Sequence, residues 1–174
     1  QQGTCCLIAL PDGQVMGATT TDPGTGGERL AKESELYLMD PVAKKITWHA
    51  VVLPGVLGYT GLCQGTDGLV YGLADGVRFF VFDPVKRTLV YEENVQEQFG
   101  QTGYQQGQRK FVRTPDGTIY ILFMKHIVRV DTASQRLVKV CDTPLPAQFG
   151  GDYHDGRLWF GGTSHLYSYR LPQG

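Results

Sequence analysis

The hydrophobic pattern consists of short apolar runs that come in pairs, with an Asp-Gly dipeptide between the two members of each pair. The four dipeptides are Asp12-Gly13, Asp67-Gly68, Asp116-Gly117 and Asp155-Gly156. Asp-Gly tolerates the positive φ angles of a tight turn, and the aspartate side chain can accept hydrogen bonds from the turn backbone. Each pair of runs therefore predicts two antiparallel strands joined by a hairpin turn in which the aspartate has a structural role.

A second repeated feature follows each hairpin: an apolar run that ends in Asp-Pro or Asp-Thr. It occurs at 36–41, 80–84 and 127–132, with a weaker copy at 166–170. Asp-Pro and Asp-Thr favour a turn, and further strands are predicted after it at 46–52, 89–92 and 137–141. The repeating unit is thus four antiparallel strands, and the Asp-Gly turns are 55, 49 and 39 residues apart.

A four-stranded unit of this size cannot bury both of its faces alone, whereas copies stacked around an axis cover one another. The sequence therefore predicts an all-β chain of four β-propeller blades, at about 4–54, 58–96, 107–143 and 149–172, with a β-sandwich as the competing architecture. No segment has a sustained helical period, and 25–35, the best helix candidate, is predicted to be a loop. The last blade lacks a fourth strand, which predicts a segment of a larger propeller completed by the rest of a parent chain or by another subunit.

Composition narrows the class of protein. Glycine, at 23 of 174 residues, and nine prolines indicate many turns. A net charge of −1 without blocks of like charge argues against a nucleic-acid partner. The apolar runs are too short for a membrane span. The cysteines Cys5, Cys6, Cys63 and Cys141 form no Cys-x-x-Cys or Cys/His pattern, so they predict small buried side chains, with a metal or a vicinal disulfide at Cys5-Cys6 as the alternative.

These repeats resemble the Asp-Gly-turn propellers of bacterial extracytoplasmic proteins, a group that includes lactonase-like, streptogramin-lyase-like and quinoprotein-like propellers. The segment 36–48, which ends in Trp48, resembles a quinoprotein blade motif. The next blades carry Tyr91 and Val140 at the corresponding place, which argues against a quinone cofactor. The acidic metal ligands of the lactonases match no position. The resemblance implies an extracytoplasmic setting and predicts neither a cofactor nor a metal.

Repeat geometry predicts where a ligand would bind. The loops between the second and third strands emerge on the same face as the links between blades, at the mouth of the central channel. The links are rich in glycine, glutamine and aromatic residues, and Gln98-Phe99-Gly100 recurs as Gln148-Phe149-Gly150. Aromatic rings can stack on sugars, and amide groups can form hydrogen bonds with hydroxyl groups, so the links suit a glycan ligand. The alternative is that the aromatic rings pack between blades. The candidate ligand-binding residues are Tyr59, Phe99, Tyr104, Arg109, Arg113, Phe149 and Tyr153.

Asp152 and His154 form the one candidate catalytic pair, because residues two apart on a strand share a face and can share a proton. Arg109, Lys110 and Arg113 are candidates to bind a carboxylate. A catalytic pair should lie open to solvent at the channel mouth, whereas a structural pair should be buried and mutually hydrogen-bonded.

Two functions follow from these features. The first is a non-catalytic recognition module that binds glycan or protein through the link face, within a larger bacterial protein. The second is a lyase or lactonase acting on a sugar acid. The first is preferred, because an enzyme of the second kind would bring several titratable groups together at one point.

Overall fold

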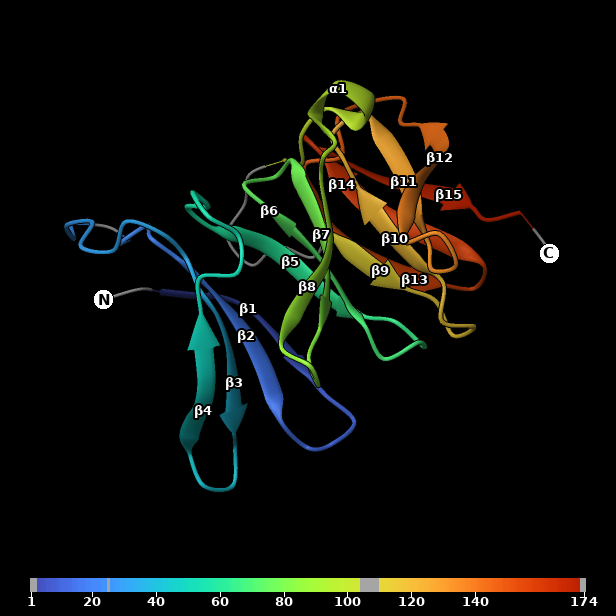
Figure 1. The fold of residues 1–174 in the computed structure, drawn as a ribbon. Helices are drawn as coiled ribbons and strands as arrows, with labels where there is room; N and C mark the ends of the chain where they lie inside the picture. The colour runs from blue at the N-terminus through green and yellow to red at the C-terminus, as the bar shows by residue number, and fades with distance from the viewer. Residues whose placement is uncertain (1–2, 25, 104–109, 173–174) are drawn as a thin grey trace.

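A computed structural model describes residues 3–24, 26–103 and 110–172 of the chain (Figure 1). These residues form fifteen strands and one four-residue helix. The first sheet contains β1 (Gly3–Ala9), β2 (Val15–Thr20), β3 (Leu36–Asp40) and β4 (Lys45–Ala50). The second contains β5 (Tyr59–Gln64), β6 (Val70–Ala74), β7 (Arg78–Asp83) and β8 (Thr88–Asn94).

The third sheet contains β9 (Phe111–Arg113), β10 (Ile119–Leu122), β11 (His126–Asp131) and β12 (Arg136–Asp142). The fourth contains β13 (Phe149–His154), β14 (Arg157–Gly162) and β15 (His165–Arg170). Within every sheet the strands are antiparallel and follow chain order. The predicted all-β fold of repeated antiparallel blades is confirmed.

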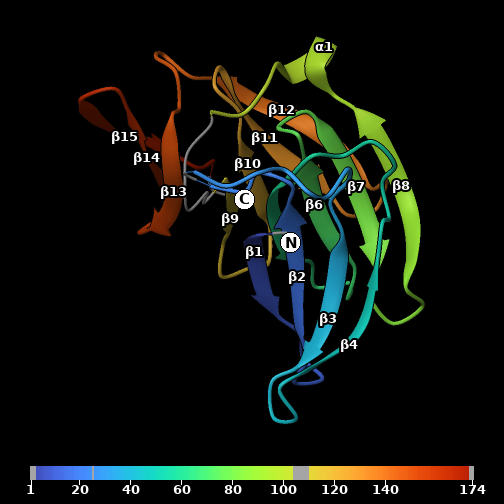
Figure 2. The same ribbon diagram turned by 90° about the vertical axis from the view of Figure 1, so that its left-hand side faces the viewer.

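The sheets follow one another in chain order around the innermost strands β1, β5, β9 and β13, which lie next to one another (Figure 2). Three hydrophobic cores lie between them, one at each junction of neighbouring sheets. The second core, for example, joins Tyr71 and Phe79 of the second sheet to Ile121 of the third. Each sheet therefore buries its faces against its neighbours, which is the physical reason for repetition.

The Asp-Gly turns behave as predicted in the first three sheets. The Oδ1 atoms of Asp12, Asp67 and Asp116 accept hydrogen bonds from backbone N–H groups two residues later, at 3.0, 3.1 and 3.0 Å. The glycine after each aspartate has a positive φ. The fourth turn is shorter, and Asp155 and Gly156 both have positive φ angles, of 47° and 71°. This is the geometry of a two-residue hairpin turn.

One short helix departs from the sequence prediction, whereas the loop after β2 agrees with it. Residues 26–35 contain no helix, as expected, whereas a helix absent from the prediction, α1 (Gln96–Phe99), lies in the link after β8. Phe99 holds this turn in place by packing on Phe123 in the second core.

Among the described residues the fourth sheet has three strands, and β15 pairs with β14 and not with β1. The incomplete last blade is therefore confirmed. No described helix has the length and apolar character needed to cross a membrane.

Candidate binding site

The links between blades are hydrogen-bonded to the loops that precede the third strand of each sheet. We call this side of the molecule the link face: links 51–58, 95–103 and 143–148, and loops 21–35, 75–77, 123–125 and 163–164. The link 51–58 accepts a hydrogen bond from Thr21 N–H at Leu57 O (2.8 Å) and one from Asp75 N–H at Gly58 O (2.8 Å). Each link thus bridges the two sheets that it joins, and the pattern continues through later sheets.

The later links repeat this arrangement. Thr102 N–H donates to Gly76 O in the second sheet (3.1 Å), and Met124 N–H of the third sheet donates to Gln101 O (3.0 Å). In the last link, Ala147 N–H donates to Met124 O at 2.9 Å. The result is a continuous chain of backbone hydrogen bonds along the link face, and it defines the rim of any site there.

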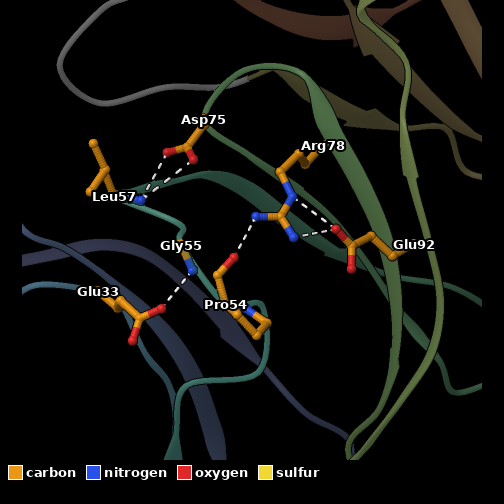
Figure 3. A network of polar contacts seen from close by, with 7 residues as sticks. All are labelled: Glu33, Pro54, Gly55, Leu57, Asp75, Arg78 and Glu92. Carbon is orange, nitrogen blue, oxygen red and sulfur yellow. Dashed lines mark hydrogen bonds and ion pairs between the residues drawn. The ribbon is translucent and has the colours of Figure 1, made fainter.

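A fifth Asp-Gly dipeptide, Asp75-Gly76, is central to this rim and was missed in the sequence analysis. Both residues have positive φ angles, 50° and 73°, as a tight turn between β6 and β7 requires. The Asp75 Oδ1 atom accepts a hydrogen bond from Leu57 N–H at 3.1 Å (Figure 3) and another from Gly58 N–H at 3.0 Å. The sequence did contain a signal for this turn, because the second repeat has two Asp-Gly dipeptides. Asp67-Gly68 precedes β6 and Asp75-Gly76 follows it, so the second turn lies on the face opposite the other four Asp-Gly turns.

Charged side chains also form hydrogen bonds with the backbone of this link. The Arg78 guanidinium pairs with the Glu92 carboxylate and donates to Pro54 O at 2.8 Å (Figure 3). On the other side of the link, the Glu33 carboxylate accepts a hydrogen bond from Gly55 N–H at 2.6 Å. Residues from the first and second sheets therefore hold the backbone of 54–58 in one conformation.

A hollow of about 910 Å³ opens inside this rim. Its lining comes from the first two sheets and from the first and second links. Five of its residues are threonines: Thr4, Thr20, Thr21, Thr60 and Thr102. Asp22, Arg29 and Asp75 add charge, and Cys5 adds a thiol. Several hydroxyls are already engaged by the scaffold: Thr60 Oγ1 accepts from Gly76 N–H at 2.9 Å, and Thr21 Oγ1 donates to Leu57 O at 3.0 Å. The wall combines these polar groups with apolar surface, and hydrogen bonds within the scaffold hold part of it in place.

The aromatic rim predicted from the links is only partly present. Tyr59 and Phe99 were expected to be exposed, but their exposed fractions are 3% and 6%. The Tyr59 ring lies in the first core, edge-on to Phe80, with ring centroids 5.5 Å apart, and burial raises the pKa of its hydroxyl. Both rings fill gaps between sheets, so the prediction of exposure is wrong. Phe149 is exposed at 39%, and Tyr104 lies outside the described residues.

The two basic candidates that the structure describes, Arg113 and Lys110, form no cationic group at the channel mouth. Arg113 is exposed at the end of β9, next to the Asp116-Gly117 turn, which places it on the face opposite the links. Lys110 is only 1% exposed and donates from Nζ to Gln148 O at 2.7 Å, and burial lowers the pKa of its ammonium group. Arg109 lies outside the described residues. The expected carboxylate-binding role of Lys110 is therefore replaced by a structural one between the third and fourth sheets.

The candidate catalytic pair fits neither arrangement expected for it. Asp152 and His154 are both exposed, and Asp152 Oδ1 accepts a hydrogen bond from Tyr153 N–H at 2.8 Å. His154 is the last residue of β13, directly before the Asp155-Gly156 turn, so it lies on the face opposite the links. Tyr153 is half-buried, and its hydroxyl accepts a hydrogen bond from Gly156 N–H at 3.2 Å. Its role is to support that turn.

Exposure of His154 leads to a simple prediction. The His154→Ala variant should keep its free energy of unfolding within about 0.5 kcal/mol of the original chain, because exposed side chains contribute little. Chemical denaturation of the two proteins, followed by circular dichroism, measures the difference. A loss above about 1 kcal/mol would indicate a buried hydrogen bond of His154 and would restore the bracing role first expected for it.

Comparison with known proteins identifies the architecture. No family model and no curated protein matches the chain. Solved β-propellers do match: the β-propeller domain of Cps50 (Swd1) from Myceliophteria thermophila, at 13% identity and a TM-score of 0.66, covers 98% of this chain. The RRP9 WD40 repeats match at 12% identity and a TM-score of 0.62 over 99% of it. The extracellular domain of a putative one-component system from B. thetaiotaomicron matches at 13% identity and a TM-score of 0.70 over 96%.

These likenesses establish the β-propeller fold. The chain spans 54% of the Cps50 chain, 49% of the RRP9 chain and 21% of the bacterial chain. The length of the matched proteins agrees with a chain that forms part of a propeller. The bacterial extracytoplasmic type of repeat stays a prediction, because identities this low carry no information beyond the fold.

Proposed function

We propose that this chain is a non-catalytic recognition module that binds a protein partner through the link face, with a polar segment of the partner seated in the hollow. The observation that carries the proposal is the hollow itself, about 910 Å³ in volume and walled by residues of two sheets and two links. Its threonines and backbone groups suit hydrogen bonding to a peptide. The hydrogen-bonded rim reduces the entropy lost on binding, because the wall is already ordered.

A glycan is the second candidate ligand, and one residue favours it. Phe149 is exposed and begins β13 at the link face, where a ring can stack on a sugar. The hollow is less suited to sugars, because among the described residues that line it Tyr59 is the one aromatic residue and is 3% exposed. A Phe149→Ala variant that loses binding on a glycan array, while the original chain binds, would establish this second candidate.

An enzyme acting on a sugar acid is the weaker alternative. It would use Asp152 and His154, but His154 lies on the face opposite the hollow. Within the described ranges no group of three or more His, Cys, Asp or Glu side chains is placed to hold a metal ion. Turnover of a lactone or an uronic-acid substrate by the original chain, lost in His154→Ala, would replace our proposal with this one.

Crosslinking from defined positions tests the recognition module. A photoreactive phenylalanine analogue at Gln101, an exposed residue of the hollow, should crosslink the partner in cells of the source organism. The matched control places the analogue at Val85, which is 86% exposed in the turn after β7 on the opposite face.

The partner identified in this way is then purified. Arg29→Ala should weaken its binding about tenfold, which corresponds to about 1.4 kcal/mol, and Lys86→Ala should not. Crosslinks from Val85 and none from Gln101 would refute the proposal.

A further inference from the structure

Two thiols meet at an irregularity of the innermost strand of the first sheet. Thr4 lies opposite Thr19 and Cys6 lies opposite Ala18, so Cys5 is the extra residue of a β-bulge between β1 and β2. A bulge interrupts the alternation of side chains along a strand. Here the Sγ atoms of Cys5 and Cys6 lie 3.8 Å apart, and both approach the Tyr59 carbonyl oxygen, at 3.1 and 3.5 Å.

The bulge itself does not require sulfur. The same irregularity recurs in β5, where Thr60 is the extra residue before Gly61, and in β13, where Gly150 is the extra residue before Gly151. Neither of those pairs contains a cysteine, although their strands have the same place in their sheets. Two adjacent thiols in the first sheet are therefore not explained by the architecture.

The two thiols differ in access and in acidity. Cys5 is exposed and lines the hollow, whereas Cys6 is half-buried against the first core. The hydrogen bond that Cys6 donates to the Cys5 sulfur lowers the pKa of Cys5 against the opposing effect of burial, and the same contact raises the pKa of Cys6. Burial raises the pKa of Cys63 to about 11 and also raises that of Cys141.

We propose that Cys5 is a site of reversible thiol–disulfide exchange with small disulfides that enter the hollow, and that Cys6 is its resolving thiol. An accessible thiol beside a second thiol is the arrangement that such chemistry uses. In the first step the Cys5 thiolate attacks one sulfur of the small disulfide. A bond forms between the two sulfurs, the disulfide bond breaks, and the other sulfur leaves as a thiolate that takes a proton from the solvent.

In the second step the Cys6 sulfur loses its proton and attacks Cys5 Sγ. The mixed disulfide breaks, a second small thiol leaves with the proton, and Cys5 and Cys6 are joined. One small disulfide is thereby reduced to two thiols while the two cysteines are oxidised. Adjacent α-carbons are about 3.8 Å apart, shorter than the usual span of a disulfide, so the product should be strained and readily reduced again. The exchange takes place at the wall of the hollow, which Cys5 lines.

The experiment uses the aromatic disulfide 5,5′-dithiobis(2-nitrobenzoate) on the intact chain, followed by alkylation, trypsin and mass spectrometry. The first basic residue is Arg29, so the tryptic peptide 1–29 contains Cys5 and Cys6 and no other cysteine. In the original chain this peptide should lose two hydrogen atoms and retain no adduct. It should also react at least about tenfold faster than the peptides of Cys63 and Cys141, because thiolate is the reacting species.

Two matched variants separate the roles of the thiols. Cys6→Ser should retain the thionitrobenzoate on Cys5, and Cys5→Ser should react slowly at Cys6. Far-UV circular dichroism checks that each variant keeps its strand content. A stable adduct on Cys5 in the original chain would refute the resolving role, and equal rates for Cys5, Cys63 and Cys141 would refute the exchange site. The reaction requires no partner protein, so its outcome is independent of the proposed recognition function.

Discussion

Replacing Gly72 with alanine is expected to lower the free energy of unfolding by about 2 kcal/mol, the range found for overpacked cores. Gly72 lies in β6 opposite Phe80 of β7, and a Cβ atom at Gly72 would come within 2.1 Å of the Phe80 ring. Phe80 is fully buried and packs edge-on against Tyr59, so the ring cannot move aside without disturbing the first core. The measurement is urea denaturation of both proteins.

Gly3→Ala is the matched control, because a Cβ atom there would meet Thr20 Cγ2 at an ordinary 3.5 Å. Its stability should stay within about 0.5 kcal/mol of the original chain. A second control is Phe80→Leu combined with Gly72→Ala, in which the smaller side chain leaves room for the new methyl group. The combined loss should be smaller than the sum of the single losses by at least about 0.5 kcal/mol. Simple additivity would show that Gly72 acts through backbone conformation and not through the ring.

The Arg78→Met variant is expected to lose about 1–2 kcal/mol of stability, since hydrogen bonds to charged groups contribute about 1.5–3 kcal/mol and partial exposure reduces this value. Arg78 Nε donates to Glu92 at 2.8 Å, and Nη1 donates to Pro54 O at 2.8 Å. The two charged side chains are 21% and 31% exposed. Methionine keeps the apolar stem but leaves Glu92 and Pro54 O without these donors. Thermal unfolding at low and high salt measures the loss.

Arg78→Lys tests whether geometry or charge matters. A lysine ammonium retains the charge, but it cannot present the guanidinium's fixed fork of donors to Glu92 and Pro54 together. We expect Arg78→Lys to lose nearly as much stability as Arg78→Met. Full stability in the lysine variant would mean that the contact with Pro54 O contributes nothing to holding the link.

The repeated strands and turns were predictable from sequence because they depend on local chemistry. Asp12, Asp67 and Asp116 accept hydrogen bonds from their own turns, and Asp40 Oδ1 does so in an Asp-Pro turn, from Val42 N–H and Ala43 N–H at 2.9 Å. These interactions span two or three residues, so the residue order alone specifies them. The need for stacking also followed, since a four-stranded unit leaves apolar residues on both faces.

The site depended on tertiary packing and was predicted less well. Phe99 resembles an exposed loop aromatic in sequence, but its ring packs on Phe123 from the next sheet. Asp75-Gly76 is chemically the same dipeptide as Asp67-Gly68, yet it forms a different turn on the opposite face, where its carboxylate reaches a link seventeen residues earlier in the chain. Contacts between sheets therefore determine both the burial of Phe99 and the position of the Asp75 carboxylate.

The sequence by itself determined the antiparallel blades, the four Asp-Gly turns and the face on which the links emerge, because turn chemistry and alternation are properties of neighbouring residues. Tertiary structure alone decided which link residues are exposed, which charged side chains hold the rim, and that the sulfur atoms of Cys5 and Cys6 lie 3.8 Å apart at a bulge beside the hollow. The reason is physical: burial and bulge position depend on the adjacent strand and the adjacent sheet, and neither is encoded in the spacing of residues along one strand.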